Sequence, residues 1–282
     1  MDTSTTHQSA AALWDDVASG WSRFATEIEA GDSDLTARIR AATGPLDGHA
    51  VLELGSGAGE LAVQIAEWVG HDGTVTASDV APAMTEVQRT RLALIPNARV
   101  VGDVNAHDLP FPENTFDTVV FRMGLMMTSD PDRALRSIHR VLRPGGRFVT
   151  TTWGPFTENP WLTTVGMSAM SLGLVSGGPP IHPGDPFSLP DPDDLRRRFT
   201  EAGFLDVDVE TLSATRHYRD TEEHVTMALS LAPPLAAAQR AMTAEQASAL
   251  RHTVTGLTEQ YRNSDGSLDV PMSAHIVVGT GG

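Results

Sequence analysis

The chain has 282 residues, of which 40% are hydrophobic and 20% are charged, enough apolar material for one sizeable core and an accessory lobe. Its formal net charge of −16 disfavours nucleic acids and anionic membranes as partners, since both are bound through basic surfaces. The chain has no cysteine and no lysine, which excludes thiolate metal sites, cysteine-held iron–sulfur clusters, Schiff bases and a P-loop lysine.

The first twelve residues are polar and lack the basic and apolar regions of a secretory signal. No run of 18 apolar residues is present, so we expect no membrane span and a cytoplasmic location.

The amino-terminal part is predicted to be helical over residues 13–43, because Leu13, Val17, Trp21 and Phe24 recur at helical spacing. Short apolar runs then alternate with amphipathic segments, which is typical of right-handed βαβ units and a parallel sheet. The predicted strands are 50–55, 74–78, 98–102, 116–122 and 147–153, and the predicted helices between them are 61–69, 82–94 and 131–142.

This rhythm is interrupted at residues 154–190, which are rich in Gly and Pro and contain one short predicted helix at 160–174. A helix at 191–202 and a strand at 204–212 follow, then a helical stretch at 220–263 and a last strand at 270–278. The sequence therefore predicts an α/β fold, Rossmann-like, with a seven-stranded mostly parallel sheet, helices on both faces and helical cap insertions. The expected parts are an N-terminal helical lid (1–44), a cofactor-binding core (45–153), a lid or acceptor insertion (154–190), continued core (191–213), a helical cap (214–269) and the last core strand (270–282).

A glycine-rich loop follows the first predicted strand. Gly55, Gly57 and Gly59 form a G-x-G-x-G pattern, which lets the backbone turn tightly and approach a ligand closely. A dinucleotide site would need a glycine where Glu60 stands, and a carboxylate there would repel a pyrophosphate. Glu53, two residues before the first glycine, suits a ligand with an ammonium group, such as the methionine end of S-adenosylmethionine.

Two further carboxylates end the next predicted strands. Asp79 is placed to accept hydrogen bonds from both ribose hydroxyls. Asp103 is placed to accept one from an adenine amino group, with the Val104 backbone N–H facing a ring nitrogen. Taken in order along the chain, these residues predict a nucleoside site at the carboxyl ends of the strands.

At this point the sequence resembles the class I S-adenosylmethionine-dependent methyltransferases, and most of all the ubiquinone/menaquinone-biosynthesis-like group that methylates small molecules. The resemblance is dense over about residues 45–153 and is carried by VLELGSGAGELA (51–62), TASDVAPAM (76–84), LPFPENTFD (109–117) and RVLRPGG (140–146). It implies S-adenosylmethionine as cofactor and S-adenosylhomocysteine as product. The cofactor-binding residues that we predict from the loop and from this resemblance are Glu53, Gly55, Ser56, Gly57, Gly59, Asp79, Val80, Met84, Asp103, Val104 and Arg122.

The sequence departs from common patterns of the family at two places. Met126, Met127 and Thr128 stand where an aromatic pair is common, and His275 stands in the last strand in place of a bulky apolar residue. The identity of the acceptor therefore cannot be inferred from the acceptor of a relative.

The acceptor pocket is expected at the carboxyl ends of the strands, under the inserted segments. Its predicted lining is Trp14, Trp21, Met126, Met127, Trp153, Trp161, Met170 and His275. The two tryptophans near the amino terminus are expected either to close over the cofactor or to anchor the first helix on the domain or on a partner subunit. Candidate general bases are His107, His182 and His217. No metal-ligand spacing is present, so no metal is expected.

The sequence thus predicts methyl transfer to an O, C or N atom of a small-molecule acceptor, natural-product or quinone-like in character. Two alternatives stay open: an enzyme of the same fold that holds the cofactor structurally and catalyses a cyclisation or another non-methyl reaction, and a non-catalytic cofactor-binding protein. A homo-oligomer formed through the N-terminal helix or the cap also stays open.

Overall fold

The computed structural model describes residues 11–282, so the first ten residues of the predicted lid lie outside it. Its centre is a seven-stranded sheet in the order β3-β2-β1-β4-β5-β7-β6, in which β1 to β5 run parallel and β7 is antiparallel to both of its neighbours. This confirms the predicted fold class. The strands are β1 (Ala50–Glu53), β2 (Thr74–Asp79), β3 (Ala98–Gly102), β4 (Phe116–Arg122), β5 (Leu142–Trp153), β6 (Leu205–Tyr218) and β7 (Leu268–Thr280).

Helices cover both faces of the sheet, as two consecutive residues of β5 show. Arg147 donates a hydrogen bond to the carbonyl of Ala42, in α4, whereas the Phe148 ring stacks on Phe199, in α9. Because neighbouring strand residues point to opposite faces, α4 and α9 cover opposite sides of the sheet. The helices of this core are α4 (Ser33–Thr43), α5 (Glu60–Trp68), α6 (Pro82–Leu92), α7 (Pro131–Val141) and α9 (Pro192–Glu201).

Local sequence signals mark where several helices begin. The side chains of Asp130, Asp191 and Asp220 accept hydrogen bonds from backbone N–H groups in the first turns of α7, α9 and α10 (Thr221–Leu231). Thr243 and Gln246 form a capping box at the start of α12 (Ala244–Thr258). These caps satisfy donors that the helices themselves leave free.

The strand predicted at 204–212 is longer in the structure and continues to Tyr218. Residues 214–218, which we expected in the cap, therefore belong to β6, where Arg216 pairs with Val270 and Tyr218 with Leu268. Arg216 is buried in this part of the strand. A charged residue at a buried position hides the alternation by which a strand is recognised.

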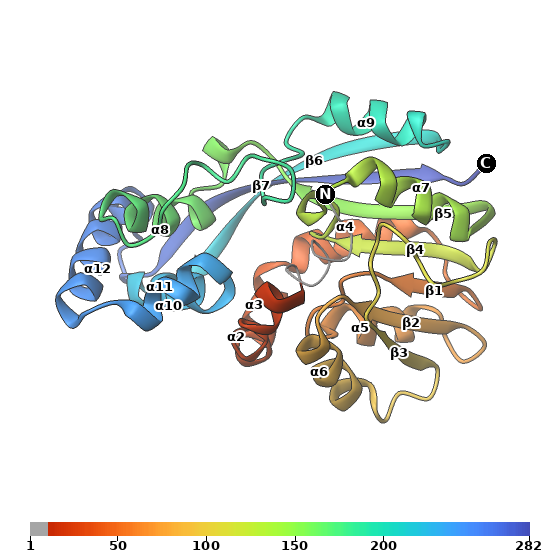
Figure 1. Ribbon diagram of the computed structural model, residues 1–282, viewed down its shortest axis with the longest axis horizontal. Helices are drawn as coiled ribbons and strands as arrows, with labels where there is room; N and C mark the ends of the chain where they lie inside the picture. The colour runs from red at the N-terminus through yellow and green to blue at the C-terminus, as the bar shows by residue number, and fades with distance from the viewer. Residues whose placement is uncertain (1–10) are drawn as a thin grey trace.

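The long β6–β7 hairpin carries a helical cap beyond the carboxyl ends of β1, β4 and β5 (Figure 1). The cap consists of α8 (Pro160–Ser171), α10, α11 (Pro233–Ala241), α12 and the short helix η3 (Glu259–Tyr261). It has an apolar cluster of its own, built from Val165, Ala169, Val225, Ala228, Leu229, Leu235, Leu250 and Val254. Two further short helices, η1 (Leu125–Met127) and η2 (Phe156–Glu158), follow β4 and β5.

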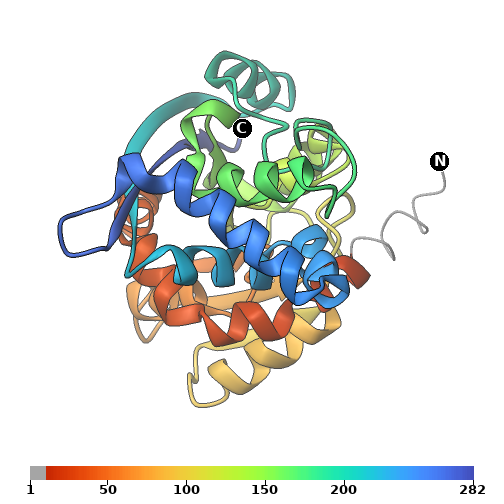
Figure 2. The same cartoon turned by 90° about the vertical axis from the view of Figure 1, so that its left-hand side faces the viewer.

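Residues 14–32, here called the strap, include α2 (Ala18–Arg23) and α3 (Ala25–Gly31). Figure 2 shows the red strap helices between the gold α6 and the blue helices of the cap. Asp15 accepts a hydrogen bond from the Ala83 backbone N–H at 2.8 Å, and the Trp21 indole donates one to the Leu231 carbonyl at 3.1 Å. The strap therefore ties the core to the cap. Within residues 11–282, no helix combines the length and the apolar character needed to cross a bilayer.

Candidate cofactor and acceptor site

The glycine-rich loop joins the end of β1 to the start of α5. Gly55, Gly57 and Gly59 all have positive φ angles, of 58°, 54° and 88°, a conformation that residues with a Cβ rarely adopt. A Cβ on Gly55 would lie 3.0 Å from the Phe121 ring, whereas a Cβ on Gly57 would meet no atom within 4 Å. The bare backbone of Gly57 therefore faces open space at the carboxyl edge of the sheet.

Helix α6 holds this loop from one side. Gln88 donates a hydrogen bond to the Gly57 carbonyl at 2.9 Å, and Arg91 donates one to the Ala58 carbonyl at 2.7 Å. Arg91 also pairs with Glu60 across 2.6 Å. These contacts hold the loop through the carbonyl groups of Gly57 and Ala58 and do not involve the backbone N–H of Gly57.

Asp79, the last residue of β2, lies against the same loop. Its carboxylate accepts hydrogen bonds from the backbone N–H groups of Gly57, at 3.0 Å, and Ala81, at 2.9 Å. Burial raises the pKa of Asp79 to about 6, although the backbone donors oppose the rise. The Val80 backbone also acts as a donor toward this carboxylate, and because a carboxylate offers about four acceptor positions, acceptor capacity remains for a ligand hydroxyl.

Glu53, the last residue of β1, is 2% exposed. Its Oε2 atom has no hydrogen-bond partner within the described part of the chain. Burial raises its pKa to about 8, even though the nearby Arg122 charge acts in the opposite direction. An unpartnered buried carboxyl beside an open backbone fits a cationic ligand group, which would supply the missing partner.

At this edge, two residues that follow strands adopt a left-handed backbone conformation although neither is a glycine. Asp103, after β3, has φ of 59°, and Met123, after β4, has φ of 54°. Such conformations cost free energy and gather at functional sites. Val104 follows Asp103 directly, is buried, and donates its backbone N–H to the Asp79 carbonyl at 3.1 Å, so that N–H is already engaged.

A chain of charged side chains crosses the carboxyl edge of the sheet. Arg122, at the end of β4, pairs with Glu29 of the strap across 2.8 Å and is also attracted by Glu53 and Asp32. Glu29 also accepts hydrogen bonds from Thr36 and Gln64. Asp32 in turn pairs with Arg216 of β6. Sequence analysis predicted Arg122 as a cofactor-binding residue but did not identify its partners, because no local pattern links residues so distant in the chain.

Comparison with known proteins agrees with this geometry. A family model described as a methyltransferase domain matches residues 52–150. The chain is 32% identical over 185 residues to the ubiquinone/menaquinone biosynthesis C-methyltransferase UbiE of Haemophilus ducreyi, covering 61% of this chain and 70% of the relative. A match with UbiE of an Escherichia coli strain has the same identity over 180 residues, covering 59% and 70%.

The chain belongs to the class I S-adenosylmethionine-dependent methyltransferases. Its fold is similar to that of YcgJ from Bacillus subtilis, with a TM-score of 0.57, 17% identity, and coverage of 88% of this chain and 97% of the other. It is also similar to phosphoethanolamine N-methyltransferase 2 of Haemonchus contortus crystallised with S-adenosylhomocysteine, with a TM-score of 0.54, 19% identity, and coverage of 88% and 52%. A third similar structure is the [4+2]-cyclase SpnF, with a TM-score of 0.51, 22% identity, and coverage of 88% and 79%.

The residues of this methyltransferase fit its cofactor, S-adenosylmethionine. The unpartnered Glu53 oxygen suits the ammonium group, the open space beside Gly57 suits close approach, and the remaining acceptor capacity of Asp79 suits a ribose hydroxyl. Two further residues predicted for this site make contacts within the chain. The Ser56 hydroxyl donates to the Glu53 carbonyl at 3.1 Å, and Met84 packs in a cluster with Ala18 and Trp21.

Several predicted acceptor residues come together between the sheet edge and the cap. The rings of Trp153 and Trp161 lie 4.9 Å apart at 60°, with Met127 and Met123 packed on the same core. Met126 is fully buried in that core, and Met170 is half-buried on α8. Trp14 and Trp21 contact each other edge to face and pack on Ala81 and Met84, so within the described residues they anchor the strap on their own chain.

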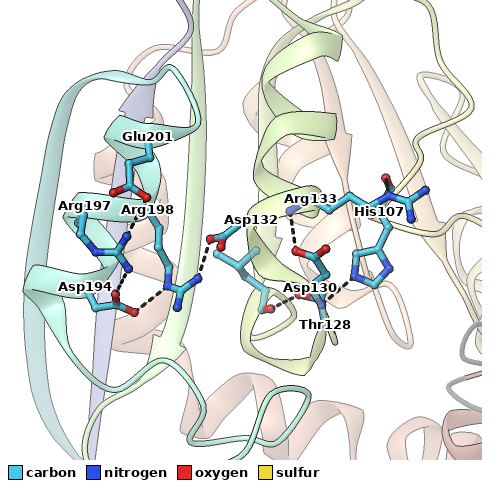
Figure 3. A network of polar contacts seen from close by, with 10 residues as sticks. His107, Thr128, Asp130, Asp132, Arg133, Asp194, Arg197, Arg198 and Glu201 are labelled. Atoms are coloured by element: carbon cyan, nitrogen blue, oxygen red, sulfur yellow. Dashed lines mark hydrogen bonds and ion pairs between the residues drawn. The ribbon is translucent and has the colours of Figure 1, made fainter. Parts of the chain in front are cut away.

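The histidines predicted as bases lie in different places. His107 accepts a hydrogen bond from the Asp130 backbone N–H at 3.2 Å, so it supports the start of α7 (Figure 3). In the same view, the pair of Arg198 with Asp132 connects α9 to α7. His182 is exposed in the 174–190 segment, and His217 is exposed on β6 and pairs with Asp269. His275, predicted in the acceptor pocket, is buried on β7, with its ring nitrogens near the Thr211 hydroxyl and the Pro190 carbonyl.

One further buried histidine was not identified by the sequence analysis. His224 of α10 is 1% exposed, stacks on Tyr218 at 4.5 Å, and its Nε2 lies 2.6 Å from the Trp161 carbonyl. Its Nδ1 has no partner among residues 11–282, and burial lowers its pKa, which disfavours the protonated ring. In the same part of the chain, no group of three or more His, Asp or Glu residues is arranged to hold a metal ion.

Proposed function

We propose that this methyltransferase acts on an O, C or N atom of a small-molecule acceptor, natural-product or quinone-like in character, that binds between the sheet edge and the cap. The observation that carries the proposal is the arrangement of Glu53 and Asp79 around the open backbone of Gly57. This arrangement would hold the cofactor with its reactive end toward the Trp153 side of the carboxyl edge, where the cap begins.

In this proposal each strand end has one task. Glu53 would bind the ammonium group, and Asp79 would bind the ribose hydroxyls. Asp103 would accept from the adenine amino group. Arg122 would favour the ionised form of Glu53, because its positive charge attracts that carboxylate while it pairs with Glu29.

When bound, S-adenosylmethionine supplies an electrophilic methyl group on a sulfonium. The protein then has to orient the acceptor and exclude water. The paired rings of Trp153, which is buried, and Trp161, which is half-buried, would form part of the wall against which a flat acceptor packs, and the strap covers the space between α6 and the cap. We propose that the protein mainly positions an acceptor that is already nucleophilic, because His182 and His217 are exposed and His217 pairs with Asp269.

The proposal is tested by incubating the full chain with S-adenosylmethionine and a panel of aromatic phenols, amines and carbon nucleophiles. We expect S-adenosylhomocysteine to form together with one methylated product. Product formation without S-adenosylhomocysteine would instead support a non-methyl reaction such as cyclisation. Cofactor binding without any turnover across the panel would count against methylation of this acceptor class.

A further inference from the structure

Arg216 is a buried cation that the cofactor site leaves unused. It lies on β6 and is 6% exposed. Its guanidinium carbon is 4.2 Å from the ring centroid of Trp161 and 6.0 Å from that of Trp153. Since Trp153 ends β5, Arg216, near the end of β6, lies close to the carboxyl edge of the sheet.

Most of the hydrogen-bonding capacity of Arg216 is unused. Its Nη2 group donates to Asp32 of the strap, whereas its buried Nε has no partner among the described residues. A guanidinium has five N–H donors in a fixed plane, arranged to bind two oxygens of one group. A buried donor without a partner is unfavourable, so an oxygen of a ligand would be stabilised at this position.

The local charges allow that oxygen to be negative. Along this edge Arg122 pairs with Glu29 and Arg216 pairs with Asp32, so each of the two arginines faces one carboxylate of the strap. A sulfonium at this edge would attract an anion bound at Arg216, because opposite charges a few ångströms apart stabilise each other. The overall charge of −16 matters less here, because salt screens exposed charges beyond about 8 Å at physiological ionic strength.

We propose that Arg216 is the acceptor-recognising residue, and that it binds an oxyanion carried by an aromatic acceptor whose ring lies against Trp161 and Trp153. The oxyanion is a carboxylate or a phenolate. This inference rests on the proposed function, since it names a chemical group of the acceptor for the same site. Asp32 is then a competitor for the same guanidinium, which an acceptor partly replaces.

A purely structural role of Arg216 makes a different prediction. If the pair only ties the strap to β6, then Asp32→Asn and Arg216→Gln should change ligand binding in the same direction. If Arg216 binds the acceptor, the two substitutions should have opposite effects, because Asp32→Asn removes a competing carboxylate and leaves the cation in place.

The experiment is isothermal titration calorimetry on the full chain saturated with S-adenosylhomocysteine. The probes are 2-naphthoate, 2-naphthol titrated at alkaline pH, and uncharged 2-naphthalenemethanol. We expect Arg216→Gln to weaken binding of an anionic probe about tenfold or more, and Asp32→Asn to strengthen it several-fold, with little change for the uncharged probe. Arg219→Gln is the matched control, since Arg219 is an exposed arginine just beyond β6 that pairs with Glu223.

The double variant Asp32→Asn/Arg216→Gln removes both charges, so it separates a loss of recognition from a loss of folding. It should melt near the wild-type temperature and bind the anionic probes as weakly as Arg216→Gln. Preference for naphthoate would identify a carboxylate, and preference for naphtholate a phenolate.

Equal affinity of Arg216→Gln and the wild type, the same direction of change in both single variants, or no binding of either anion to the wild type would overturn the inference. S-adenosylhomocysteine affinity is measured in the same samples. Its absence in the wild type would contradict the proposed cofactor site, whereas its presence without anion binding would contradict only the role of Arg216.

Discussion

Glu29 of the strap and Arg122 at the end of β4 form an ion pair of 2.8 Å, although 93 positions separate them in the chain. Their side chains are 20% and 14% exposed, so neither charge is fully hydrated. Burial raises the pKa of Glu29, but the charge and hydrogen bonds of Arg122, Thr36 and Gln64 outweigh it and hold the pKa below its ordinary value. The strap is therefore fastened to the carboxyl edge of the sheet, where the predicted cofactor-binding residues lie.

Removing this carboxylate should destabilise the protein. We expect Glu29→Gln to lower the free energy of unfolding by about 1–3 kcal/mol at pH 7, because Arg122 loses its partner in a partly buried site. A depressed carboxyl pKa gives stability that is present above pH 4.5 and is lost as the pH falls through the folded value, so the two proteins should converge in acid. Urea unfolding measures this, with Glu27→Gln, exposed on the same helix, as the control.

Gly57 offers a test of close approach by the cofactor. Alanine at its φ of 54° costs about 1–2 kcal/mol in stability, but its Cβ would meet no protein atom within 4 Å. We expect Gly57→Ala to fold and to bind S-adenosylhomocysteine about tenfold or more weakly, measured by calorimetry. Gly48→Ala is the matched control, because Gly48 has φ of 74° and equal space around it but lies before the start of β1. Equal cofactor affinities in the two variants would contradict the site.

Cofactor binding should release a proton from Glu53. Its pKa of about 8 leaves the carboxyl mostly protonated at pH 7, and a neighbouring ammonium group would favour the ionised form. We expect release of about one proton per cofactor bound, seen as a difference in binding enthalpy between phosphate and Tris buffers. Glu53→Gln should abolish the difference, whereas Glu67→Gln, exposed on α5, should retain it. Buffer-independent enthalpy in the wild type would argue against the ammonium assignment.

The same raised pKa has a consequence for the cofactor-free protein. A carboxyl whose pKa rises from 4.5 to about 8 on folding gives stability that is complete below pH 4.5 and declines as the pH rises through 8. Asp79 adds a smaller effect of the same sign, since its pKa rises from 3.8 to about 6. We expect the Glu53→Gln variant to lose less stability than the wild type between pH 5 and pH 8, measured by thermal melting. A parallel decline in both proteins would refute this reading of Glu53.

The contact between the strap and the cap can be tested at Trp21. Its indole N–H donates to the Leu231 carbonyl at 3.1 Å. Trp21→Phe keeps an aromatic ring but removes that donor, so we expect about 1 kcal/mol of local destabilisation and faster amide hydrogen exchange in α2 and α3. Trp14→Phe serves as the comparison, because Trp14 contributes ring packing beside Trp21. Unchanged exchange in Trp21→Phe would mean that the hydrogen bond does not hold the strap.

The sequence by itself predicted the fold class and the tight turns of the glycine-rich loop. Gly55, Gly57 and Gly59 predict a tight turn, because few other residues adopt positive φ angles. The position of Asp79 at the end of a strand is predicted from the alternation of strands and helices along the chain. These signals are local: each depends on residues that are neighbours in the chain.

Only the tertiary structure decided how the carboxyl edge is covered. The pairs of Glu29 with Arg122 and of Asp32 with Arg216 join the strap to β4 and β6, and Arg216 was expected in a helical cap rather than on a strand. Ion pairs between residues that are distant in the chain produce no periodic pattern in the sequence. The sequence also does not distinguish a buried arginine from an exposed one, because burial depends on the tertiary structure. The physical reason is that folding, not local propensity, sets which distant charges share a site from which water is largely removed.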